Sequence, residues 1–471
     1  MRRTKIVCTI GPATSSPEML EKLIRMGMNV ARLNFSHGTY DEHRERITHT
    51  RRICEKLGTT VAVLQDLPGP KMRIGGFADP PVRVTPGQEF TFTTRDIEGD
   101  SSAVRLPFPE IVRQAKRGQL IYVDDAKLEF RVVSATDTDI ITKVVIGGEL
   151  GSSKGFTVPG ASIAIPGVTE QDKEDLRFGL DYGVDWVASS FVRSADDIKP
   201  LRKVMREAGR RVPVIAKIER PEAVRNIESI VEAYDGVMVA RGDLGIELPI
   251  HEVPVIQKSI IRHCNCAGKP VITATQMLDS MMSSPRPTRA EVTDVANAII
   301  DGTDAIMLSG ETAVGKFPVE SVKMMDMIAR RTERSADFLE PCRQRLDYVA
   351  RDTTEAFGEA AVRLARDIRL AAIITCTFGG TTARLVSKYR PQTQIIGAAS
   401  NEETARRLAL CWGVKPVYVE MAKDTDGLIR NAVEAAQDSK LVNKGDSVLV
   451  IAGVPVGVPG NTSLIRVLKV E

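Results

Sequence analysis

The sequence predicts an α/β protein: a (β/α)8 barrel, a small β-barrel lid domain inserted into it, and a C-terminal open α/β sheet. Three features predict this class. Apolar runs of strand length alternate with helical patterns over residues 1–67 and 167–340. Residues 68–166 instead show short alternating segments between Gly- and Pro-rich turns, typical of an all-β domain. Residues 341–471 resume the strand–helix alternation and are expected to form a third domain with its own core.

The barrel prediction rests on a count of strand–helix units. Three strands are expected before the insertion, at residues 6–10, 29–34 and 61–66, and five after it, ending near residues 191, 219, 241, 275 and 310. Helices are expected to begin near residue 17 and to span 41–57, 170–182, 195–209, 221–234, 251–267 and 289–300. The helix at 221–234 has one apolar stripe and Pro221 in its first turn. Eight units are the number in a (β/α)8 barrel.

The other two domains have patterns of their own. The insertion has one short helical turn near 111–116 and strand candidates at 89–93, 120–123, 130–133 and 140–145. It leaves the barrel after the third strand, so we expect it to close over the carboxyl ends of the strands as a lid. The C-terminal domain begins with a charged helical stretch, followed by strands at 370–376, 394–399, 415–420, 447–452 and 464–470.

Composition and charge exclude several classes of protein. The 471 residues are 43% hydrophobic and 27% charged, and the net charge of +3 predicts neither a nucleic-acid nor a membrane partner. The N-terminus lacks the apolar core of a signal peptide, and no run approaches the roughly 18 apolar residues of a membrane helix. Seven irregularly spaced cysteines indicate reduced thiols in a cytoplasmic protein. We interpret Cys264 and Cys266 as ordinary helix cysteines.

Polar side chains converge at the predicted carboxyl ends of the barrel strands, where barrels of this kind carry their chemistry. Seven of the eight ends have such residues: Arg32 and Asn34 with Ser36 beyond, Asp66, Ser190, Lys217 with Glu219, Asp243, Thr275, and Glu311. Lys217 and Glu219 lie two apart on one strand and therefore point the same way. With Asp243 at the next strand end, they suit a divalent metal that holds phosphate oxygens. Taken alone, Lys217 and Glu219 could equally form a surface ion pair. The alternative for Ser190, and for Thr275, is that its side chain caps a helix.

A glycine turn adds a possible anion site. Gly242 and Gly245 flank Asp243 at a strand–helix junction. Glycines there let backbone N–H groups approach an anion, and a helix N-terminus favours negative charge. A substrate carboxylate would fit this turn, with Thr275 donating a further hydrogen bond. The alternative is an ordinary tight turn.

The motifs of the chain are similar, in order and over its whole length, to those of the pyruvate kinases: ARLNFSHG at 31–38, KIE at 217–219, ARGDLG at 240–245, ATQML at 274–278, RPTRA at 286–290, DVAN at 294–297 and SGET at 309–312. The arrangement of barrel, lid and C-terminal domain resembles that family as well. The resemblance implies transfer of the phosphoryl group of phosphoenolpyruvate to ADP, which gives pyruvate and ATP. It also implies a homotetramer.

The resemblance assigns catalytic roles by position. Glu219 and Asp243 would hold Mg²⁺ or Mn²⁺. Lys217 would neutralise charge on the phosphoryl group in flight, while Arg32 and Arg73 would hold phosphate oxygens. Such chemistry needs positioning and charge neutralisation more than a covalent nucleophile, which fits a site without an activated Ser, Cys or His.

Further positions are assigned to binding. The substrate carboxylate would be framed by Gly242, Asp243 and Thr275, and the proton for enolpyruvate would come from a water or hydroxyl chain near Thr275. The nucleotide would be contacted by Asn34, Ser36, His37 and Arg73. Two departures from the family pattern bear on the ADP contacts: Ala126 replaces the usual Gly, and Gln171 replaces a frequent Lys.

The most informative departure concerns K⁺. Many pyruvate kinases bind K⁺ through an Asn, a Ser and an Asp-Thr pair, under the influence of a Glu five residues after that Asp. Asn34, Ser36 and Asp66 are retained, but Leu67 replaces the Thr and Lys71 replaces the Glu. A lysine ammonium is a fixed positive charge, so the chain resembles the K⁺-independent, bacterial-like branch. The alternative is a lysine in solvent at the hinge of the lid.

The C-terminal domain contains a second candidate site. A turn with glycines and hydroxyls, TFGGTTAR at 377–384, follows a strand and opens a helix, as phosphate-binding turns do. The family uses this turn for a phosphorylated effector, and the candidates are Thr377, Gly379, Thr381 and Thr382. The nearby loop 455–462 has no basic residue, and only Lys423 could serve a second phosphate. We therefore expect AMP or a sugar monophosphate as effector; the alternative is an ordinary capped turn.

Two other functions compete with the kinase. A metal-dependent C–C lyase acting on pyruvate or its enol would also use Glu219 and Asp243, but would not need the lid, Arg73 or the C-terminal domain. A catalytically dead sensor of sugar phosphates would be expected to lose Lys217, Glu219 or Asp243, and all three are present.

Overall fold

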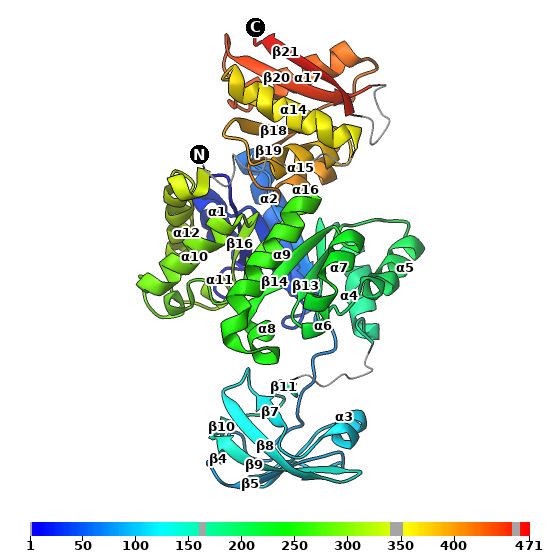
Figure 1. Ribbon diagram of the computed structural model, residues 1–471, viewed down its shortest axis with the longest axis vertical. Coiled ribbons are helices and arrows are strands. Elements are labelled where there is room, and N and C mark those ends of the chain that lie inside the picture. The colour runs from blue at the N-terminus through cyan, green and yellow to red at the C-terminus, as the bar shows by residue number, and fades with distance from the viewer. Residues whose placement is uncertain (1, 160–165, 340–351, 455–461) are drawn as a thin grey trace.

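A computed structural model describes residues 2–159, 166–339, 352–454 and 462–471. Three domains follow one another along its long axis, with the C-terminal domain at one end, the barrel in the middle and the inserted domain at the other end (Figure 1). The predicted fold class is confirmed. No helix in the described ranges is long and apolar enough to cross a membrane.

The barrel is a closed ring of eight parallel strands in the order β1-β16-β15-β14-β13-β12-β3-β2. The strands are β1 (Lys5–Thr9), β2 (Val30–Asn34), β3 (Ala62–Asp66), β12 (Trp186–Ser189), β13 (Val214–Ile218), β14 (Gly236–Ala240), β15 (Val271–Ala274) and β16 (Ala305–Leu308). Almost all of their residues are buried. One face of each strand fills the barrel interior and the other packs beneath helices, which explains the unbroken apolar runs.

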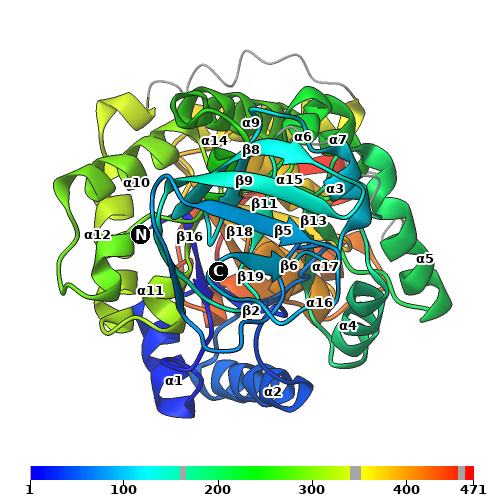
Figure 2. The ribbon, with the colours of Figure 1, turned by 90° about the horizontal axis from the view of Figure 1, so that it is seen from below.

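Helices surround the barrel (Figure 2). They are α1 (Pro17–Met26), α2 (Tyr40–Leu57), α4 (Glu170–Asp181), α5 (Lys199–Glu207), α6 (Pro221–Arg225), α7 (Ile227–Ala233), α8 (Arg241–Glu247), α9 (Val253–Ala267), α10 (Arg289–Asp301), α11 (Gly310–Ala313) and α12 (Pro318–Thr332). Short 3₁₀ turns occupy Ala195–Ile198, Ile250–Glu252 and Asp279–Met282. Capping boxes begin three of the helices, α2, α4 and α10, at Thr39, Thr169 and Thr288.

The prediction of one helix over 221–234 is wrong. The segment divides at Asn226, which ends α6 and begins α7 with φ of −99° and ψ of 17°. The side-chain amide of Asn226 donates to the carbonyl of Arg193 at 2.9 Å. Asn favours such local and capping bonds over the helix interior, so the apolar stripe alone did not indicate the break.

The inserted domain is all-β apart from α3 (Pro109–Gln114). A six-stranded sheet has the order β11-β7-β8-β9-β5-β6, and β10 pairs with β4 in a second sheet. The strands are β4 (Val82–Val84), β5 (Glu89–Thr93), β6 (Ala103–Arg105), β7 (Leu120–Val123), β8 (Leu128–Ala135), β9 (Asp139–Ile146), β10 (Gly148–Leu150) and β11 (Phe156–Thr157). Both sheets share one core that includes Phe90, Phe92 and Phe130. Seen from below, the strands cross the middle of the ring of helices (Figure 2).

The C-terminal domain is a five-stranded sheet in the order β19-β18-β17-β20-β21, in which β21 alone runs antiparallel to its neighbour. Its strands match the five predicted: β17 (Ala372–Thr377), β18 (Gln394–Ala399), β19 (Val414–Tyr418), β20 (Ser447–Gly453) and β21 (Thr462–Lys469). Its helices are α14 (Thr353–Asp367), α15 (Thr381–Lys388), α16 (Glu402–Leu408) and α17 (Thr425–Asp438). The charged stretch expected at the start of this domain falls largely on 340–351, outside the described residues.

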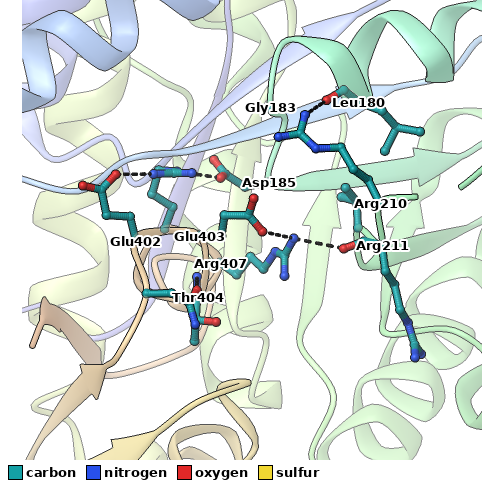
Figure 3. A network of polar contacts seen from close by, with 12 residues as sticks. Leu180, Gly183, Asp185, Arg210, Arg211, Glu402, Glu403, Thr404 and Arg407 are labelled. Atoms are coloured by element: carbon teal, nitrogen blue, oxygen red, sulfur yellow. Dashed lines mark hydrogen bonds and ion pairs between the residues drawn. The ribbon is translucent and has the colours of Figure 1, made fainter. Parts of the chain in front are cut away.

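The C-terminal domain contacts the amino end of the barrel, opposite to the lid. Asp185, just before β12, accepts a hydrogen bond at 2.8 Å from Nε of Arg406 in α16. Arg407 of the same helix donates to the carbonyl of Arg211 at 3.1 Å, and its own carbonyl accepts from Nε1 of Trp186 at 3.2 Å. Figure 3 shows Glu403 and Arg407 of α16 beside Asp185 and Arg211 of the barrel.

Candidate active site

Barrel closure brings the predicted strand ends together. Strands β13 and β14 are parallel neighbours with Ile218 opposite Val239, so Glu219 leaves the barrel beside the start of α8. On the other side, β12 joins β13 to β3, and Ala188 lies opposite Asp66. The lysine of β13 therefore faces carboxylates that come from both its own strand and β3.

Lys217 is the centre of this cluster. Its Nζ lies 2.6 Å from Oγ of Ser190, 3.0 Å from Oε1 of Glu219 and 3.2 Å from Oδ1 of Asp66. The side chain is 13% exposed. Burial by itself would lower the pKa of Lys217, but the negative charges of Asp66 and Glu219 outweigh burial and raise it. The lysine is therefore an ammonium at neutral pH, held in one position.

Asp66 links this ammonium to a second cation. Its Oδ2 accepts from Nε of Arg32 at 2.7 Å, and Nη1 of Arg32 donates to Oγ1 of Thr9 at 2.8 Å. Burial would raise the pKa of Asp66, but Lys217 and Arg32 together hold it below its usual value. Asp66 thus stays ionised and fixes the two positive groups side by side at the mouth of the barrel.

Glu219 is suited to a metal ion. Its Oε2 accepts a hydrogen bond at 2.7 Å from the backbone N–H of Phe191, and the residue is 1% exposed. Burial raises its pKa and the charge of Asp243 adds to this effect, while Lys217 opposes it. A divalent cation between Glu219 and Asp243 would offset this excess of buried negative charge. Within the described ranges, no group of three or more His, Cys, Asp or Glu residues could hold a metal ion. Glu219 and Asp243 would therefore be the two protein ligands, and they would leave coordination positions for substrate and water oxygens, as Mg²⁺ prefers.

The residues of the predicted anion turn lie together, and two of their donors already have acceptors within the protein. Oγ1 of Thr275 accepts from the N–H of Gly242 at 2.8 Å and donates to the carbonyl of Ala274 at 2.7 Å. Thr275 has φ of +68°, which is strained for a β-branched residue. Arg241 holds it there: Nη2 donates to the carbonyl of Thr275 at 2.6 Å, and Nη1 pairs with Asp294 at 2.7 Å. Backbone strain of this kind is concentrated at functional sites.

Two predicted residues contact the lid rather than the strand-end cluster. Nη1 of Arg73 donates to the carbonyl of Ser153 at 2.9 Å. Nζ of Lys71 lies 3.7 Å from Oδ1 of Asp125. Lys71, Asp125 and Asp243 nevertheless line one cleft between the lid and the barrel. The local sequence shows only that Lys71 and Arg73 follow β3. Their contacts are with residues much later in the inserted domain, so they depend on how that domain folds back onto its own first residues.

The residues assigned to the K⁺ region and the nucleotide lie next to β2 and β3. Oδ1 of Asn34 accepts from the N–H of Ser36 at 3.2 Å. Leu67 is 2% exposed in the barrel core, and its carbonyl accepts from Oγ of Ser190 at 2.7 Å. His37 is exposed, and its carbonyl contacts Nε2 of His43 at 3.1 Å.

The predicted effector turn follows β17. Oγ1 of Thr377 accepts from the N–H of Gly380 at 2.9 Å, and Oγ1 of Thr382 lies 3.0 Å from Oγ1 of Thr462. Both hydroxyls therefore already have partners within the protein. Gly379 has open space where a side chain would be. The rest of the loop that was expected beside this turn, 455–461, lies outside the described residues.

The roles of two residues near these sites were not predicted from the sequence. Ser190 is one of the predicted strand-end residues, and the structure makes it the nearest partner of Lys217. Arg384 donates to Oγ1 of Thr381 and to the carbonyl of Gly379, both at 3.2 Å, and so places a cation on the effector turn. Its position three residues after Thr381 on a helix puts both on one face, which was a readable signal.

The fold and the site define a (β/α)8 barrel protein with a lysine, two acidic side chains and an arginine at its carboxyl mouth. Comparison with known families agrees: residues 1–322 match the barrel-domain model of pyruvate kinase, and residues 355–468 match its alpha/beta-domain model. The chain belongs to the pyruvate kinase family of phosphotransferases.

Individual relatives cover nearly the whole chain. It is 45% identical to a pyruvate kinase of Staphylococcus saprophyticus, 46% identical to one of Geobacillus stearothermophilus and 44% identical to one of Staphylococcus aureus. Each comparison covers 99% of this chain and 80% of the relative.

Proposed function

We propose that this protein transfers the phosphoryl group of phosphoenolpyruvate to ADP, which gives pyruvate and ATP. The observation that carries the proposal is the Lys217 ammonium, which three oxygen atoms hold beside Glu219 at the mouth of the barrel. Phosphoryl transfer needs fixed positive charge where negative charge moves, and a site fixed before the substrate arrives has little reorganisation cost.

Each residue has a separate role in this proposal. Glu219 and Asp243 hold Mg²⁺ or Mn²⁺, which when bound neutralises phosphate charge. Lys217 faces the phosphoryl group in transfer, and Arg32, fixed by Asp66, orients its oxygens. Gly242, Asp243 and Thr275 frame the substrate carboxylate. Arg73, with Asn34, Ser36 and His37, completes the nucleotide side, which requires Arg73 to exchange its contact with Ser153 for phosphate oxygens.

The proposal extends to independence of K⁺. Lys71 lines the same cleft as Asp243, and its contact with Asp125 is a half-exposed ion pair 3.7 Å long. Such pairs contribute little to stability, so the ammonium is available to the bound substrates. Leu67 replaces the Thr whose hydroxyl many members use for K⁺, and its side chain offers no oxygen ligand. Lys71 then supplies the charge that K⁺ supplies in other members.

A coupled assay tests both statements. ADP-dependent formation of pyruvate is followed with lactate dehydrogenase and NADH, in buffer free of K⁺ and Na⁺, with Mg²⁺ or with Mn²⁺. We expect full activity without K⁺, and none in Lys217→Met or without divalent metal. Absence of ADP-dependent pyruvate would overturn the kinase proposal and favour a lyase. A large stimulation by K⁺ would overturn only the role of Lys71.

We further propose that the protein is a cytoplasmic homotetramer regulated at the turn formed by Thr377, Gly379, Thr381 and Thr382. The open space at Gly379 and the guanidinium of Arg384 suit one phosphate group, as in AMP or a sugar monophosphate. Titration of activity with AMP, ribose 5-phosphate, glucose 6-phosphate and fructose 1,6-bisphosphate tests this. Activation that persists in Thr382→Val would contradict the assignment, and sedimentation velocity measures the oligomeric state.

A further inference from the structure

A cavity of about 560 Å³ lies where the C-terminal domain meets the amino end of the barrel, at the opposite end from Lys217. The residues before β1, the end of α14 and the loop between α15 and β18 form its walls, with the start of β19. None of the described lining residues is Asp or Glu, and six of them are basic: Arg2, Arg3, Arg366, Arg369, Arg390 and Lys415. A cavity whose charged lining residues are all positive concentrates positive electrostatic potential.

Part of this charge has no neutralising partner. Among the described residues, neither Arg369 nor Lys415 forms an ion pair with a carboxylate. Lys5 lies near Lys415: it is 4% exposed and donates to the carbonyl of the preceding residue, Val414, at 2.6 Å. Burial lowers the pKa of Lys5 well below its usual range, and the charges of Lys415 and Arg2 lower it further. An anion bound here would offset the charges of Lys415 and Arg2.

Three of the six basic residues already pair with carboxylates: Arg2 with Asp326, Arg366 with Asp367 and Arg390 with Asp304. Arg369 and Lys415 supply the charge that an anion in the cavity would meet, and phosphate oxygens are strong acceptors for charged donors of this kind. Val362 and Leu370 add apolar surface that would suit the organic part of a ligand.

We propose that this cavity binds a phosphorylated metabolite with two or more negative charges. The site differs from the effector turn, because the cavity lies at the amino end of β17 and the turn at its carboxyl end. Six residues of strand separate the two ends by roughly 17 Å. A bound ligand joins Arg2 and Arg3 of the barrel chain to Arg369 and Lys415 of the C-terminal domain, so it holds the two domains together.

Calorimetric titration with inorganic pyrophosphate in metal-free buffer tests the proposal. The background protein for this titration is the full chain with Lys217→Met and Thr382→Val. These two changes disable the strand-end cluster and the effector turn, so the outcome does not depend on the proposed function. Into this background we place Lys415→Met or Arg369→Met. The matched control is Lys444→Met, an exposed lysine of the same domain that does not line the cavity.

We expect pyrophosphate to bind the background protein, with Kd raised at least tenfold by Lys415→Met and by Arg369→Met and unchanged by Lys444→Met. Lys415→Arg should restore binding to within threefold. Because Arg369 is exposed, its replacement leaves folding intact even if Lys415→Met does not fold. No binding to the background, or equal binding in all variants, would overturn the proposal. Fructose 1,6-bisphosphate and ADP should bind more tightly than pyrophosphate; weaker binding of both would exclude an organic ligand.

Discussion

Replacement of Ser190 by Ala tests whether the position of Lys217 is set by its neighbours. The Ser190 hydroxyl donates to the carbonyl of Leu67 at 2.7 Å and accepts from Nζ of Lys217 at 2.6 Å. Ser190→Ala removes both bonds and leaves the two ion pairs of Lys217 with Asp66 and Glu219. The lysine keeps its charge, so the change affects its position and not its protonation.

The two lost bonds have different consequences. The bond to the carbonyl of Leu67 is neutral, and its loss should lower the free energy of unfolding by about 1 kcal/mol. The bond from Lys217 is charge-assisted and corresponds to about 1.5–3 kcal/mol. If it orients the lysine for the transition state, kcat/KM should fall by roughly 10- to 150-fold.

Ser321→Ala is the matched control. Ser321 is buried and its hydroxyl also donates to a backbone carbonyl, that of Phe317, at 2.8 Å. It has no contact with Lys217. Urea unfolding and the coupled pyruvate assay are measured for both variants. Ser190→Ala should lose more free energy of unfolding than the control, since it also loses the charge-assisted bond, but only Ser190→Ala should lose activity. A Ser190→Ala protein with the kcat/KM of the control would refute the reasoning.

Three further changes have defined outcomes. Lys71→Glu with Leu67→Thr should make activity depend on K⁺, since it removes the fixed charge and restores a ligand; activity without K⁺ equal to that of the parent protein would contradict this. Ala126→Gly should raise the free energy of unfolding of the lid by about 0.5–1 kcal/mol, because Ala126 has φ of +63°. Urea unfolding measures this change. A lower stability of the variant would contradict the argument that Ala126 strains the backbone. His43 is buried and its pKa falls to about 4. The unfolded chain therefore binds more protons between pH 6.5 and 4, and stability falls as pH falls through this window, by up to about 3 kcal/mol. In His43→Gln the decline of the thermal midpoint over that window should be smaller, and an unchanged decline would exclude His43 as its source.

Much of the architecture follows from local patterns in the chain. Buried parallel strands appear as short apolar runs, and the residue that ends each run lies at one rim of the barrel whatever the details of packing. For this reason Lys217, Glu219 and Asp243 could be assigned to one mouth before any contact was known. The five strands of the C-terminal domain were readable for the same reason.

Contacts between segments distant in sequence could not be read in this way. The position of a strand end predicts convergence, but only barrel closure makes Ser190 the nearest partner of Lys217 and places Asp66 between Lys217 and Arg32. The break at Asn226 depends on a carbonyl of another loop, that of Arg193. Hydrophobic periodicity records which residues are buried and not which polar atoms they meet.

The sequence by itself determined the barrel, the inserted and C-terminal domains, and the set of charged residues at the strand ends, because each is encoded in a local period or a strand terminus. Only the tertiary structure decided which partners hold Lys217, that Lys71 and Arg73 contact the lid, and that a basic cavity lies between the barrel and the C-terminal domain. The physical reason is that electrostatic and hydrogen-bond energies depend on distances of a few ångströms between residues that the chain separates widely.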